Sequence, residues 1–203
     1  MNQMLSQEFS EQEVATALKQ MASLKALGLN GIPPLFYQHF WGIVGQDITS
    51  LILIWLNSSI LPTPLNQTFI DIPKIHNPEH THQYRPISIC NVLYKIYSKV
   101  LANRLKKLTP HIVLEHQLAF IKDRLISDNI LVAFETLHSL QNYKSRTHGF
   151  MAIKLDISKA YGWVDWNFLE QLMRKLGYNE RWVQLIMGCV KTVSYSVLVN
   201  GEL

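Results

Sequence analysis

The stretch "KLDISKAYGWVDWNFLE", residues 154–170, decides what this chain can be. It follows an apolar, alternating run, "GFMAIKL", which predicts a strand over 150–156 that ends at Asp156. It closes as an amphipathic helix that Asp165 is placed to cap. A carboxylate at a strand end can bind a divalent metal, but it is also a common helix cap or solvated loop residue. Partners elsewhere in the sequence must decide between these roles.

The bulk composition describes a globular chain of 203 residues, 48% apolar, with a net charge of +4. Its longest apolar run, 48–61, is interrupted by polar residues and is shorter than the roughly 20 residues that cross a bilayer. The polar, acidic N-terminus lacks the pattern of a secretory signal. We therefore expect an intracellular protein without a membrane partner, in the nucleus or the cytoplasm. Cys90 and Cys189, far apart and outside any CxxC motif, are expected to be small buried residues.

The periodicity predicts a mostly helical α+β chain. Ser10 and Glu13 form a capping box, Gly45 is expected to separate two helices, and Gly177 to end another. The expected helices are 11–25, two within 35–57, 94–108, 128–141, 166–176 and 180–191, and the expected strands lie near 68–73, 150–156 and 194–199. Ser127 or Asp128 is expected to cap the 128–141 helix, and Asn179 the 180–191 helix. Its buried face is expected to hold Ile130, Leu131, Phe134, Leu137 and Leu140.

Three blocks in order, residues 83–108, 114–138 and 151–178, resemble the reverse transcriptases of LINE-type, non-LTR retrotransposons, particularly those of plants. The resemblance implies the fingers of a right-handed polymerase over 1–149 and the start of its palm over 150–203. Asn200–Gly201 predicts a hairpin whose second strand is absent, so we expect a fragment truncated at its C-terminus, without the rest of the palm and the thumb.

The resemblance also implies roles for single residues. Asp156 matches the first catalytic aspartate, which bridges two Mg²⁺ ions about 4 Å apart, and the Ile157 carbonyl would be a further metal ligand. Tyr161 matches an aromatic steric gate against a 2′-hydroxyl, although a core tyrosine is the alternative. Arg85 matches the arginine that binds the incoming triphosphate. Lys74 is a weaker candidate for the same role, and a solvated strand end is its more ordinary explanation.

A cluster of basic residues marks the middle of the chain. Its members are Lys95, Lys99, Arg104, Lys106 and Lys107. They are expected to contact the phosphates of an RNA template or DNA primer, and the alternative is the solvated face of a helix. His76, His80 and His82 lie close in sequence, but without a second ligand cluster a loop is favoured over a metal site.

Departures from the family pattern favour loss of activity. Leu27, Leu29 and Asn30 stand in a loop where the family usually has two prolines and an aspartate. Asp123 stands where a glycine is usual, at a position expected to need a positive φ. Gly162 stands where the family usually has an aspartate, but that aspartate is not the metal ligand, which is matched by Asp156. Because one carboxylate cannot hold two metals, we expect the isolated chain to be inactive as an RNA-directed DNA polymerase. The alternative function is that of a non-enzymatic relic or a domesticated nucleic-acid-binding module.

Overall fold

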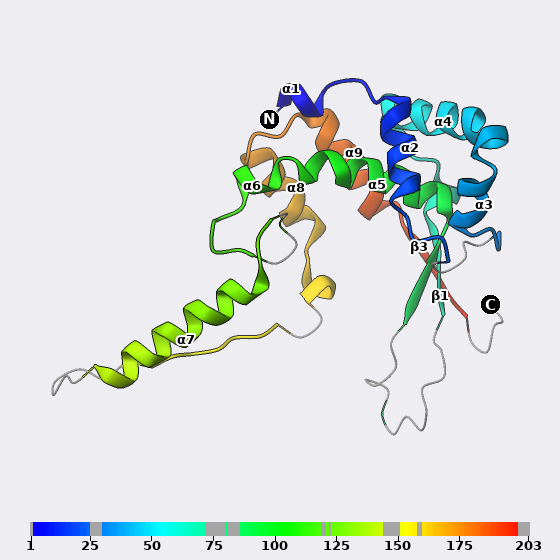
Figure 1. Ribbon diagram of the computed structural model, residues 1–203. Coiled ribbons are helices and arrows are strands. Elements are labelled where there is room, and N and C mark those ends of the chain that lie inside the picture. Colours follow the sequence, from blue (N-terminus) through cyan, green and yellow to red (C-terminus); the bar gives the residue numbers. More distant parts are fainter. Residues whose placement is uncertain are drawn as a thin grey trace. The chain divides into compact units, whose positions relative to one another are not determined.

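The protein is described by a computed structural model, shown in Figure 1. The structure describes residues 2–24, 30–71, 80, 86–118, 121, 123–143, 151–157 and 160–198, with only the backbone at Tyr161. The chain divides into two compact units. The first comprises Met1–Arg104 and Asp165–Leu203, and the second comprises Leu105–Val164. The expected division into fingers and palm at residues 149 and 150 stays a prediction.

The described residues form an α+β structure in which helices predominate, as the sequence predicted. The helices are α1 (Asn2–Leu5), α2 (Glu11–Lys19), α3 (Pro34–His39), α4 (Trp41–Ser58), α5 (Val92–Lys106), α6 (Thr109–Ile112), α7 (Ile126–Asn142), α8 (Trp166–Lys175) and α9 (Glu180–Lys191). Two short 3-10 helices are η1 (Thr63–Asn66) and η3 (Ala160–Trp163). The strands are β1 (Gln67–Asp71), β2 (Ile87–Cys90) and β3 (Ser194–Leu198).

The three strands form one small sheet in the order β2-β1-β3. β1 lies beside β3 and pairs with it parallel (Figure 1), and it pairs with β2 antiparallel. In this register Phe69 is opposite Ile89 on one side and Ser196 on the other. β1 and β3 match the strands expected near 68–73 and 194–199, although residues 72–73 and 199 lie outside the described residues. The sequence did not predict β2. This strand has only four residues and lies at an edge, so its pairing with β1 defines it more than its own pattern does.

The core of the first unit joins helices from both ends of the chain. Its fully buried side chains include Val14 of α2, Ile52 of α4, Ile96 of α5 and Trp182 of α9. Buried Asn66, before β1, donates from Nδ2 to the carbonyl oxygen of Cys189 at 3.0 Å, and to the Thr192 hydroxyl at 2.9 Å. The start of the sheet is thereby tied to the end of α9.

Local signals for helix ends are largely confirmed. The Asp165 carboxylate accepts hydrogen bonds from the backbone N–H groups of Asn167 and Phe168, and the Asn179 side chain accepts one from Arg181 N–H. The capping box at the start of α2 is also present. Gly177 ends α8 in the left-handed region, with φ +79°. The expected caps of α7 are wrong, because α7 begins at Ile126 after Leu125, without a side-chain cap.

Gly45 does not separate two helices, as the sequence had suggested. It lies inside α4, and the break between α3 and α4 falls at Phe40. A Cβ at Gly45 would lie 2.9 Å from two ring atoms of Trp41, one turn earlier. Glycine therefore serves here to let the indole lie against the helix backbone, which is a packing requirement rather than a helix break.

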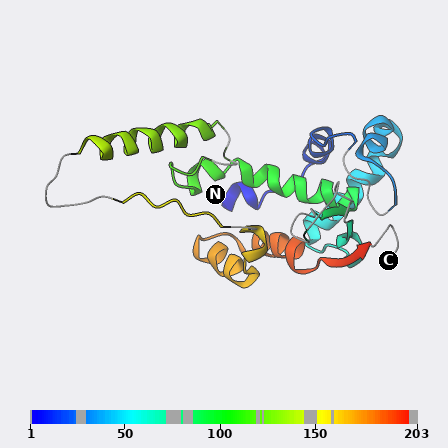
Figure 2. The same ribbon diagram turned by 90° about the horizontal axis from the view of Figure 1, so that it is seen from below.

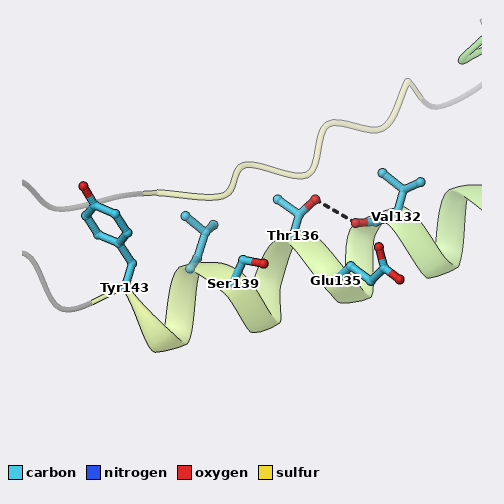
Figure 3. Close-up of a pocket in the computed structure, with 6 residues that line it drawn as sticks. Val132, Glu135, Thr136, Ser139 and Tyr143 are labelled. Atoms are coloured by element: carbon cyan, nitrogen blue, oxygen red, sulfur yellow. Dashed lines mark hydrogen bonds between the residues drawn. The ribbon is translucent and has the colours of Figure 1, made fainter.

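In the second unit, α7 is an exposed helix rather than the half-buried one that was expected. None of its residues is buried, and Ile130 and Phe134 are 67% and 68% exposed. A hollow of about 390 Å³ lies along α7, lined by residues that include Val132, Glu135 and Tyr143 (Figure 3). The apolar pattern of α7 correctly identified a face, but no described residue covers that face.

The strand expected over 150–156 is also wrong for the described residues 151–157, which have no regular secondary structure. Figures 1 and 2 both show this segment running beside α7. Leu155 is 86% exposed, and the other apolar residues of the segment are exposed as well. A strand requires a hydrogen-bonded neighbour, and the described residues provide none here. Among the helices described, none is long and apolar enough to cross a bilayer.

Candidate nucleic-acid interface

Helix α5 carries most of the basic cluster predicted from the sequence. Its buried face includes Ile96, Val100 and Leu101, which pack into the core of the first unit. At about 100° per residue, Lys95, Lys99 and Lys106 fall within about 40° of one another around the helix, on the side away from that face. Their Cα atoms span about 16 Å along the axis. We refer to Lys95, Lys99 and Lys106 as the lysine row.

The side chains of this row are available to a ligand to different degrees. Lys106 is exposed and Lys99 is half-buried, and within the described parts of the chain neither makes an ion pair. Lys95 is half-buried. Lys107 is exposed immediately after α5, where the carbonyl end of the helix favours cations. Flexible ammonium groups along one helix face can follow a row of phosphates without reading base sequence.

Arg104 lies on the opposite side of α5, about 180° from Lys95. It is 5% exposed, and its guanidinium lies 3.7 Å from the centre of the Phe9 ring. Nε and Nη2 donate to the two carboxylate oxygens of Glu13 at 2.6 and 2.8 Å. Nη2 also donates to the carbonyl oxygen of Glu8 at 2.7 Å.

The remaining donors of Arg104 are engaged as well. Nη1 donates to the carbonyl oxygens of Gln7 at 2.6 Å and of Leu5 at 3.3 Å. A guanidinium has five N–H donors, and here all five have acceptors within the protein. No donor is left for a phosphate, so we leave Arg104 out of the candidate interface. In the sequence, Arg104 follows Ile96 by eight residues and Val100 by four. This helical spacing places Arg104 on the buried face.

Glu13 is the ion-pair partner of Arg104, and the sequence did not predict this pair. Burial raises the pKa of its carboxyl, but hydrogen bonds from Arg104 and from the Ser10 N–H outweigh that effect and hold the pKa below its usual value. The same carboxylate thus completes the capping box of α2 and pairs with a buried cation of α5. The capping box was visible in the sequence, whereas its second partner, 91 residues away, was not.

Of the residues expected to form a catalytic site, the structure describes Asp156, Ile157 and the backbone of Tyr161. Asp156 and Ile157 are exposed in the irregular segment 151–157. Tyr161 lies in η3, but its side chain is outside the described parts, and Arg85 and Lys74 lie outside the described residues altogether. Of the three histidines, His76 and His82 are likewise outside them. No group of three His, Cys, Asp or Glu side chains that could hold a metal occurs within the described ranges.

The acids that follow Asp156 in the sequence serve structural roles. Asp165 caps α8, and Glu170 forms ion pairs with Arg174 and Lys191. Among the residues that the structure describes, the donors at Asp156 are therefore too few for a two-metal site, and no reaction step is assigned to one here. Leu27 and Leu29 lie outside the described residues, whereas Asp123 has φ +64°, which confirms the positive φ expected there.

Tyr94 of α5 and Cys189 of α9 lie close together but are unsuited to nucleophilic chemistry. Burial raises the pKa of the Cys189 thiol to about 12, and the pKa of the Tyr94 phenol is also raised, mainly by burial. The Tyr94 hydroxyl donates to the carbonyl oxygen of Cys189 at 3.2 Å. These groups stay protonated at neutral pH and act as packing and hydrogen-bonding residues.

Comparison with known proteins supports the family that the sequence resembles. The family model described as "Reverse transcriptase (RNA-dependent DNA polymerase)" matches residues 72–202, more than half of the chain. A curated relative is the "Transposon TX1 uncharacterized 149 kDa protein" of Xenopus laevis, which is 25% identical over 193 residues. The match covers 94% of this chain and 14% of that protein. The chain therefore spans a small part of the length of its relative.

Proposed function

Because the chain belongs to the reverse transcriptase (RNA-dependent DNA polymerase) family, we propose that it is a nucleic-acid-binding section of a retrotransposon reverse transcriptase. A relative named as a transposon protein supports this origin, and the order of the three sequence blocks supports the LINE-type branch. The particular resemblance to plant retrotransposons stays a prediction. An RNA template and a DNA primer are the proposed partners, and an intracellular location, nuclear or cytoplasmic, goes with them.

The lysine row is the single observation that carries this proposal. Three lysines share one face of a continuous 15-residue helix whose opposite face is buried. Of the basic cluster, Arg104 is committed to internal contacts, so the proposed interface consists of Lys95, Lys99, Lys106 and the adjacent Lys107. Each phosphate that a lysine neutralises releases counterions, so binding should weaken steeply as salt rises.

The catalytic assignments remain proposals by family resemblance. Asp156 and the Ile157 carbonyl would be ligands of Mg²⁺, Tyr161 would be the steric gate, and Arg85, with Lys74 as a weaker candidate, would bind the nucleotide triphosphate. When bound, Mg²⁺ would supply positive charge for nucleotidyl transfer. Since the described residues contain no group of three His, Cys, Asp or Glu side chains that could hold a metal, we propose that these 203 residues bind nucleic acid without polymerising nucleotides.

A second candidate function is that of a relic or domesticated module that binds nucleic acid without any catalytic role. The exposed position of Asp156 in an irregular segment favours it, as does the aspartate at the left-handed position 123. Both candidates require nucleic-acid binding by α5. They differ only in whether supplying further palm residues would restore polymerisation.

The test is the affinity of the chain for a fluorescent RNA–DNA primer-template. We expect the Lys99→Glu, Lys106→Glu double variant to weaken binding at least tenfold at about 50 mM salt. The matched control is Lys19→Glu with Lys175→Glu, which makes the same change in net charge near the C-terminal ends of α2 and α8. Equal losses in the two variants would mean that binding depends on net charge alone and would refute an interface on α5.

A further inference from the structure

The N-terminal residues 2–10 cross several helices that lie far apart in the sequence. Asn2 Nδ2 donates to the carbonyl oxygen of Gly177 at 2.7 Å, and Asn2 Oδ1 accepts from Asn179 N–H at 3.0 Å. Both partners belong to the turn between α8 and α9. We call residues 2–10 the N-terminal strap.

Two buried side chains anchor the N-terminal strap. Leu5 is 3% exposed and Phe9 is 5% exposed. The Phe9 N–H donates to Asn57 Oδ1, near the end of α4, at 3.3 Å. The same Asn57 oxygen accepts a hydrogen bond from Arg181 of α9. The strap thus contacts the α8–α9 turn at one end and α4 at the other.

Arg104 of α5 holds the middle of the strap. Three of its five donors bond strap carbonyls, those of Leu5, Gln7 and Glu8, and the guanidinium stacks on Phe9. The other two donors bond Glu13, in the first turn of α2. Lysine could not reproduce this arrangement, because an ammonium group has three donors and no planar fork.

We propose that Arg104 is a positioning residue that fastens the N-terminal strap and thereby fixes α5, with its lysine row, against α2, α4 and the α8–α9 turn. The strap lies well before residue 72, where the match to the polymerase family begins. The folded unit that presents the lysine row therefore includes residues that the family match does not cover. Arg104 supports nucleic-acid binding through the placement of α5, without touching a phosphate.

The first test needs no nucleic acid and so stands apart from the proposed function. In hydrogen–deuterium exchange, amides of the strap should exchange at least tenfold faster in Arg104→Met than in the wild type. Arg104→Lys should fail to restore protection, because the fork is required as well as the charge. Strap amides as protected in both variants as in the wild type would overturn the proposal.

The second test uses the primer-template and rests on the proposed function. Arg104→Met should bind more weakly than the wild type but keep the wild-type slope of log K against log salt. A slope reduced by about 0.7 to 0.9 would assign a phosphate contact to Arg104 and refute a positioning role. Wild-type affinity with a released strap would show that the strap does not position α5.

A milder variant keeps the proposal testable if Arg104→Met does not fold. Asn2→Ala removes only the contacts with Gly177 and Asn179, far from Arg104 in the sequence. Faster exchange over residues 2–6, with the amides of α5 unchanged, is the expected result. Unchanged exchange over residues 2–6 would mean that the strap is not held at the α8–α9 turn, which the proposal requires.

Discussion

The pairing of Glu13 with Arg104 makes Glu13→Gln the most informative stability variant in this chain. Glutamine keeps the shape of the side chain and can still serve at the third position of a capping box, so the start of α2 is preserved. What it removes is the negative charge beside a guanidinium that is 5% exposed. It also replaces one of the two carboxylate oxygens by an NH₂ group. Because Oε2 is the oxygen that accepts from the Ser10 N–H, keeping the capping box places this NH₂ group opposite Arg104 Nε, from which it cannot accept.

The size of the effect follows from these contacts. A hydrogen bond to a charged group contributes about 1.5 to 3 kcal/mol, and breaking a buried ion pair costs about 3 to 5 kcal/mol. Three backbone carbonyls still solvate Arg104, and the Glu13 side chain is 26% exposed, which reduces the loss. We therefore expect Glu13→Gln to lower the free energy of unfolding by about 2 to 3 kcal/mol at pH 7.

The assay is urea denaturation followed by tryptophan fluorescence, with Glu11→Gln as the matched control. Glu11 lies in the same first helical turn and is exposed, so its loss should cost no more than about 0.5 kcal/mol. Because the pKa of Glu13 is lowered by folding, its contribution is present above the unfolded pKa of about 4.5 and is lost as pH falls through the lower folded value. The wild type should thus approach Glu13→Gln in stability below about pH 4.5. Equal losses for the two variants at pH 7 would mean that the Glu13–Arg104 pair contributes no more to stability than an exposed carboxylate does.

Three further predictions concern a cap, a left-handed residue and catalysis. Asp165→Ala should destabilise by about 1 kcal/mol in thermal unfolding, because two backbone N–H groups of α8 lose their acceptor, whereas Asn167→Ala should change stability by less than half of that. Ser59, at φ 59° after α4, should accept glycine with a gain of about 1 kcal/mol in urea denaturation, while Ser58→Gly inside the helix should lower stability. Primer extension on an RNA template with Mg²⁺ or Mn²⁺ should match a no-protein control and should not change in Asp156→Asn. Extension abolished by that substitution would show that a second carboxylate of this chain completes the site.

The sequence predicted best those features that nearby residues determine. Asp165 and Asn179 cap their helices because the acceptors lie two or three residues from the donors, and the positive φ at Asp123 is equally local. Helix periodicity placed α5 and α9 within a few residues. These signals needed no knowledge of the tertiary structure.

Features that depend on distant residues were missed. Gly45 was expected to break a helix because the position of the Trp41 indole could not be foreseen, and β2 is a strand only because β1 lies beside it. The apolar face of α7 was recognised, but periodicity does not reveal whether anything covers that face.

The candidate site shows the same division. The row of lysines follows from helix spacing, so the sequence could predict it. The commitment of Arg104 depends on Glu13 and on strap carbonyls almost a hundred residues earlier, so only the structure could separate it from the lysines. The sequence shows only that the five residues of the basic cluster are cationic, whereas burial and hydrogen bonding distinguish their roles.

Counting phosphate contacts tests whether this member of the reverse transcriptase family binds nucleic acid through the lysine row. The measurement is the slope of log K against log salt for the primer-template, compared between the wild type and the triple variant Lys95→Gln, Lys99→Gln, Lys106→Gln. If each lysine neutralises one phosphate, the magnitude of the slope should fall by about 2 to 2.7 in the triple variant. It should stay unchanged in Lys19→Gln with Lys175→Gln. A triple variant that keeps the wild-type slope would contradict the assignment of the interface to α5.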